Sequence, residues 1–77
     1  MEKLELSIPE LFGKNVQKYR KIAGLTQMEL SKRLDITQKH LSVIENGSQF
    51  ASASLIAKIS QELKVTPAGY LWIIEIN

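Results

Sequence analysis

The chain has no cysteine and only one histidine among its 77 residues. Disulfides and thiolate zinc sites are therefore excluded, and one histidine does not make a metal site by itself. The acidic residues are scattered and form no paired motif, and the chain has no glycine-rich phosphate loop. Because the usual groups for catalysis are missing, we expect no enzymatic activity and no bound metal or cofactor.

Long apolar runs are also missing from the chain. No stretch approaches the roughly 20 apolar residues that a membrane-spanning helix needs. The first residues, MEKLELS, carry acids where a signal peptide carries basic residues. We therefore expect a cytoplasmic protein. A chain of this length forms one small domain, and no repeat or low-complexity tract divides residues 1–77.

Positive charge is modest in total but uneven in distribution. The formal net charge is +2, yet residues 11–44 hold seven basic side chains against two acids. Residues 1–10 and 45–77 are both net negative. A concentrated positive field favours binding to a phosphate backbone, although solvated lysines on helix surfaces produce the same pattern.

Two helix starts carry the capping-box signature, in which a Ser or Thr precedes a Glu by three positions. Ser7 and Glu10 begin a helix that we expect to end near residue 23, before Gly24. Thr26 and Glu29 begin the next helix. The first helix carries an apolar stripe at spacings of three and four, formed by Phe12, Val16, Tyr19 and Ile22.

A tight corner at residues 35–37 should separate the second helix from a third over residues 38–45. Asp35 tolerates the left-handed conformation, and Thr37 is a good N-cap. At 100° per residue, Leu41 and Ile44 point into the core. The opposite side carries Gln38, Lys39, Ser42 and Val43, with His40 near the boundary.

The rest of the chain predicts two further helices. Ser52 should cap a helix whose core face carries Leu55, Ile56, Ile59 and Leu63, and Thr66 with Pro67 should begin a last one. Residues 66–77 form an apolar helix or tail, while residues 1–6 form a short arm. A small domain cannot bury all the apolar side chains of this tail, so we expect a dimer contact there, made by Tyr70, Trp72, Ile73 and Ile76.

The chain resembles the phage-repressor-like helix-turn-helix family, which contains lambda repressor, Cro and the XRE-type regulators. The resemblance covers about residues 11–72. It rests on Phe12-Gly13, Val16, Tyr19-Arg20, Gly24-Leu25-Thr26-Gln27, Glu29-Leu30, Ile36-Thr37, Leu41-Ser42-Val43-Ile44-Glu45-Asn46-Gly47, Leu63-Lys64-Val65-Thr66 and Tyr70-Leu71.

The resemblance implies an all-α, five-helix DNA-binding domain with a helix-turn-helix at about residues 26–45. The helix over residues 38–45 would enter the major groove of double-stranded DNA, which has room for an α-helix. By the resemblance, Gln38, Lys39 and Val43 contact bases, with Ser42 and His40 as helpers. Gln27 would bind phosphate and buttress the first base-reading residue, and Asn46 would bind phosphate. Arg20 and Glu45 match a partly buried structural ion pair.

The sequence departs from the family pattern at three places. Asp35 replaces the usual corner glycine and Ser31 the usual alanine, and both are tolerable changes. The loop over residues 48–51 lacks the Lys or Arg that family members often place on DNA. We therefore expect fewer backbone contacts on that side.

Two functions remain open from the sequence. The first is a sequence-specific transcriptional regulator, such as a repressor, that binds a palindromic operator as a homodimer. The alternative is an antitoxin-like module that holds a partner protein and binds DNA secondarily. No small-molecule ligand is indicated.

Overall fold

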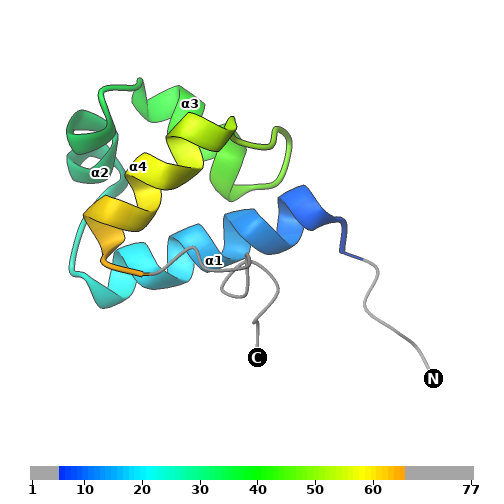
Figure 1. Cartoon of the computed structure of the whole chain (residues 1–77), viewed down its shortest axis with the longest axis horizontal. Helices are drawn as coiled ribbons and strands as arrows, with labels where there is room; N and C mark the ends of the chain where they lie inside the picture. The colour runs from blue at the N-terminus through cyan, green and yellow to red at the C-terminus, as the bar shows by residue number, and fades with distance from the viewer. Residues whose placement is uncertain (1–5, 66–77) are drawn as a thin grey trace.

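The computed structural model describes residues 6–65, and every regular element in that range is a helix. The helices are α1 (Ile8–Ile22), α2 (Gln27–Leu34), α3 (Gln38–Glu45) and α4 (Ala53–Leu63). Helix α1 packs against α3 and α4, while α2 packs against α3 and α4 (Figure 1). The all-α class expected from the sequence is thus observed. None of these helices is long and apolar enough to cross a membrane.

Each helix begins at a hydroxyl residue whose side chain accepts a hydrogen bond from a backbone N–H three residues later. The four N-caps are Ser7, Thr26, Thr37 and Ser52. The first two are complete capping boxes, because Glu10 and Glu29 accept in return from the backbone N–H of the cap. An N-cap of this kind stabilises a helix by about 1 kcal/mol. The helix starts predicted from the sequence within this range are confirmed.

The corner between α2 and α3 depends on a left-handed residue. Asp35 has φ 60° and ψ 43°, the conformation expected where family members use glycine. Its backbone N–H donates to the Lys32 carbonyl, and the N–H of Ile36 donates to the Ser31 carbonyl. These bonds close α2 and let Thr37 start α3 two residues later.

The core lies where the four helices meet. Seven apolar or aromatic side chains are fully buried there: Phe12, Val16, Leu30, Leu34, Leu41, Ile44 and Ile59. Tyr19 packs against this core, but Ile22, which completes the predicted stripe of α1, is 70% exposed. That part of the prediction is wrong, because the stripe reaches the last turn of α1, beyond the core.

The backbone of α1 lies very close to the backbone at the end of α3. A Cβ placed on Gly13 would collide with the carbonyl oxygens of Ile44 and Glu45. Gly13 therefore lets the last turn of α3 lie directly on α1, which fixes the direction of α3 relative to the rest of the domain.

Several predictions fall outside the described residues. They are the arm over residues 1–6 except for its last residue, the fifth helix over residues 66–77 and the dimer contact of Tyr70, Trp72, Ile73 and Ile76. Four helices are described, so the five-helix count stays a prediction.

Candidate nucleic-acid interface

Helix α3 has one fully buried face and one open face. Leu41 and Ile44 are fully buried against the core, whereas Gln38 and Lys39, in the first turn, are exposed. Ser42 and Val43, which were also expected on the open face, are half-buried, and so is His40, which was expected near its boundary. The structure thus brings the five predicted base-contacting and helper residues onto one helix, with its first two residues most accessible.

The first turn of α3 is held in place by its cap. The backbone N–H of His40 donates to Thr37 Oγ1 at 3.0 Å. This bond defines where α3 begins and therefore which side chains occupy its first turn. Because a major-groove helix reads bases chiefly with its N-terminal residues, the accessible turn of α3 is the one suited to that task.

Gln27 is the first residue of α2 and is half-buried. Its Nε2 donates a hydrogen bond to Glu45 Oε1 at 3.0 Å. The resemblance leads one to expect that this side chain buttresses Gln38, but the hydrogen bond in the structure runs to the end of α3 instead. The N-terminus of α2 itself is suited to an anion, because its first backbone N–H groups and the helix dipole favour negative charge.

Arg20 and Glu45 form the ion pair expected from the resemblance. Arg20 Nε lies 2.7 Å from Glu45 Oε2, and Nη2 lies 3.1 Å from Oε1. The two side chains are only 9% and 3% exposed. Arg20 Nη1 also donates to the carbonyl oxygen of Leu25 at 2.8 Å. The pair therefore joins α1, the turn before α2 and the end of α3.

Asn46 follows α3 and is exposed. Its Oδ1 accepts hydrogen bonds from the Ser48 backbone N–H at 2.9 Å and from Ser48 Oγ at 2.6 Å. The acceptor side of the amide is therefore occupied by the protein's own loop. The Nδ2 group is a donor, which is the polarity that a phosphate contact requires.

Glu29 lies in the first turn of α2 and is exposed. Hydrogen bonds from the backbone and side chain of Thr26 hold the pKa of the Glu29 carboxyl below its ordinary value. The carboxylate is thus part of the cap that orders the start of α2.

Residues 13–73 match the family described as "Helix-turn-helix domain". The chain belongs to the XRE-type, lambda-repressor-like helix-turn-helix family. One curated relative, the antitoxin PezA of Streptococcus pneumoniae serotype 4, is 38% identical over 56 residues, or 73% of this chain. The chain spans only 35% of the length of that antitoxin.

Two further relatives match over most of their length. The uncharacterized HTH-type transcriptional regulator YazB of Bacillus subtilis is 32% identical over 57 residues, which cover 74% of this chain and 83% of YazB. The crystal structure of the clp gene regulator ClgR from C. glutamicum superposes with a TM-score of 0.84 at 26% identity, covering 96% of this chain and 92% of ClgR. These findings place the chain among helix-turn-helix DNA-binding regulators.

The loop after α3 carries an aromatic side chain that contacts the core. Phe50 packs edge-on against the buried Phe12, with ring centroids 5.3 Å apart and planes at 88°. Its side chain is nevertheless 45% exposed. The sequence gives no periodic pattern in this loop, so the aromatic contact was not predicted.

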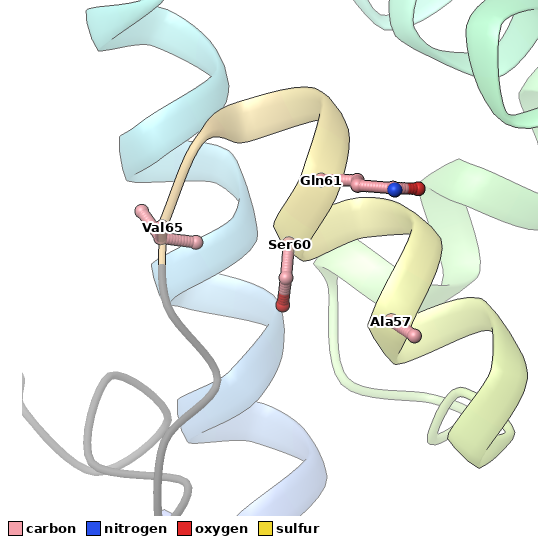
Figure 2. Close-up of a pocket in the computed structure, with 4 residues that line it drawn as sticks. All are labelled: Ala57, Ser60, Gln61 and Val65. Atoms are coloured by element: carbon pink, nitrogen blue, oxygen red, sulfur yellow. The ribbon is translucent and has the colours of Figure 1, made fainter.

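A pocket of about 310 Å³ lies along α4 (Figure 2). Among the described residues, Ala57, Ser60, Gln61 and Val65 line it. Ser60 is buried, and its Oγ makes no hydrogen bond to another residue within 6–65. None of the predicted DNA-contacting side chains lines this pocket, so it takes no part in the candidate interface.

Proposed function

We propose that this chain is a sequence-specific transcriptional regulator that reads the major groove of DNA with α3. The observation that carries the proposal is the contrast between the two faces of α3. Leu41 and Ile44 are fully buried, while Gln38 and Lys39 project from the capped first turn. Exposed long polar side chains at this position have the reach and the donors that base edges require.

The chemistry of the open face suggests a division of tasks. Gln38 can bond with the adenine N6 and N7 atoms, and Lys39 can donate to guanine O6 and N7. Val43 can pack on a thymine methyl group, with Ser42 and His40 beside it. Three classes of base contact are thus available from one short helix.

Contacts to the DNA backbone would come from Gln27 at the start of α2 and from Asn46 after α3. Both side chains carry N–H donors, and the Gln27 side chain bonds to Glu45, the residue before Asn46. Phosphate contacts of this kind set the register of a protein on the duplex and carry no direct sequence information.

We further propose that two protomers bind a palindromic operator. The apolar residues of the C-terminal segment, Tyr70, Trp72, Ile73 and Ile76, would form the two-fold contact. Two recognition helices related by such an axis read half-sites about 34 Å apart, or one helical turn.

Selection of bound sequences from a pool of random duplexes tests this function directly. We expect an enriched motif with two inverted half-sites whose centres lie about 10 base pairs apart. Enrichment of a single, asymmetric half-site would contradict the homodimer. No enrichment above the starting pool would contradict sequence-specific binding altogether.

The antitoxin-like alternative is supported by the similarity to PezA, an antitoxin by name. In this reading a partner protein occupies the apolar C-terminal segment, and DNA binding is secondary. Native purification distinguishes the two functions. A stoichiometric protein partner that dissociates when Trp72 and Ile76 are replaced by Ser favours the antitoxin-like module, and a homodimer without such a partner favours the regulator.

A further inference from the structure

The Glu45 carboxylate is shared by three hydrogen bonds from two different side chains. Arg20 donates to both of its oxygens, at 2.7 and 3.1 Å, and Gln27 donates to Oε1 at 3.0 Å. The ion pair alone would make Glu45 structural. The third bond reaches the first residue of α2, which the proposed function places on DNA.

The polarity of the Gln27 amide follows from its partner. A carboxylate accepts hydrogen bonds and donates none, so the Nε2 group must be the part that faces Glu45. Nε2 carries two hydrogens, and the bond to Glu45 uses one of them. A phosphate oxygen also only accepts, so the second hydrogen of the same nitrogen has the polarity that DNA requires.

The charge of Glu45 would oppose DNA binding if it stood alone. It lies behind the N-terminus of α2, where a bare carboxylate would repel an incoming phosphate. The positive guanidinium group of Arg20 compensates that charge within the buried pair. Glu45 can therefore hold the Gln27 amide without presenting a net negative charge to DNA.

We infer that Glu45 is a positioning residue for DNA binding: it accepts one Nε2 hydrogen of Gln27 and so aims the other at a backbone phosphate. This inference rests on the proposed function, because it needs DNA at the start of α2. Glu45 itself touches no DNA. Its effect on affinity passes through Gln27.

A charge-matched pair of variants gives the first test, with a random-sequence duplex of about 30 base pairs as the probe. Glu45→Gln and Glu62→Gln each remove one negative charge, and Glu62 of α4 forms a surface pair with Arg33 of α2 at 3.8 Å. On charge alone both variants would bind DNA more tightly. We expect Glu45→Gln to bind about tenfold more weakly, because a neutral amide oxygen accepts the hydrogen bond from Gln27 less strongly than a carboxylate does and an amide can also turn its own donor toward Gln27. Glu62→Gln should bind no more weakly than the wild type.

A second variant tests the same role in case Glu45→Gln does not fold. Arg20→Met with Glu45→Met replaces the buried pair by apolar side chains of similar size, a change that proteins often tolerate. Thermal unfolding measures whether it folds. The folded double variant should also bind about tenfold more weakly. Adding Gln27→Ala should then cause no further loss, although the same change weakens the wild type about tenfold.

The side-chain amide signals of Gln27 in the wild-type protein provide a measurement that needs no variant. One Nε2 hydrogen should exchange slowly with solvent, and the other should shift when the duplex is added. Wild-type affinity in both variants, or unchanged Gln27 signals in the DNA complex, would overturn the role of Glu45. If the wild type bound no duplex at all, the proposed function itself would fail.

Discussion

Gln38 and Lys39 are neighbours in sequence and share the exposed first turn of α3. Their side chains make no hydrogen bond or ion pair within the described part of the chain. Side chains that do not support the fold can be changed without disturbing it. This separates their proposed role in DNA reading from any role in stability.

We predict that Gln38→Ala or Lys39→Ala weakens binding to the selected operator by about 1–3 kcal/mol and leaves the melting temperature unchanged. Each change removes a donor that would otherwise meet a base edge. Titration of labelled operator measures the affinity. Gln61→Ala and Lys58→Ala are matched controls, because both replace exposed residues of α4. Equal affinities for all four variants would contradict the proposal that α3 contacts the bases.

A single residue, Glu29, makes the stability of the folded state depend on pH. Its folded-state pKa is lowered by hydrogen bonds from the backbone and side chain of Thr26. The unfolded chain therefore binds the proton more readily, so the carboxylate stabilises the folded state above the ordinary glutamate pKa of about 4.3. This stabilisation is lost as pH falls through that value toward the lower folded-state pKa.

We therefore predict that Glu29→Gln unfolds at a lower temperature than the wild type at pH 7. The difference should shrink as both proteins are acidified to pH values below the folded-state pKa of Glu29. Glutamine keeps an acceptor for the capping box but lacks the charge, so the comparison isolates the carboxylate. Thermal melts at a series of pH values measure the effect. A difference that stays constant with pH would contradict the assignment.

At the scale of helices, local signals predicted the starts and the corner well. The N-caps, the two capping boxes and the left-handed Asp35 depend on residues within four positions of each other. Local patterns carry this information directly. They also predicted that α3 buries Leu41 and Ile44.

Contacts between residues far apart in the sequence were harder to predict from the sequence. The resemblance supplied the Arg20–Glu45 pair, but the bond from Gln27 to Glu45 spans 18 positions and no spacing rule predicts it. The exposure of Ile22 depends on where the other helices end, and the periodicity of α1 gives no information about that. Base contacts, phosphate contacts and the dimer are still predictions for the same reason: each depends on a second molecule.

The contact between α1 and α3 yields a prediction for Gly13. Gly13→Ala should destabilise the protein by about 1–3 kcal/mol, the usual cost of overpacking. The new methyl group would meet the backbone carbonyls of Ile44 and Glu45, which cannot rotate away as a side chain could. Chemical denaturation measures the change. Lys14→Ala, at the neighbouring exposed position, is the control, and an equally small effect of both changes would contradict the close approach.

For the whole molecule, the structure refines the charge distribution seen in the sequence. Arg20, one of the seven basic residues in 11–44, is buried and paired with Glu45. The remaining six are exposed, and they are Lys14, Lys18, Lys21, Lys32, Arg33 and Lys39. Only exposed charges release counterions from DNA when they bind it.

We predict that DNA affinity falls steeply with salt, with a log–log slope of no more than about 5 per protomer. This bound corresponds to six neutralised phosphates, one for each exposed basic residue of the segment 11–44. Fluorescence anisotropy between low and physiological salt measures the slope. A flat response would mean that the basic segment does not face DNA.

Two apolar parts of the chain are considered as contacts between protomers. Phe50 is exposed in the loop after α3, and the C-terminal segment holds Trp72 and Ile76. We predict that sedimentation at tens of micromolar gives twice the 8.7 kDa mass of one chain. The contact should be isologous, since most small homo-oligomers are two-fold dimers.

Paired variants decide which surface makes the contact. Trp72→Ser with Ile76→Ser should give the monomer mass, because it removes the apolar area that we assign to the two-fold interface. Phe50→Ser should leave the dimer intact, because its ring already packs on Phe12 within one protomer. Because two linked protomers bind two half-sites together, the monomeric variant should also lose affinity for the full palindrome but keep it for a single half-site. Dissociation by Phe50→Ser alone would move the interface to the loop after α3, and a wild-type mass of 8.7 kDa would exclude the dimer.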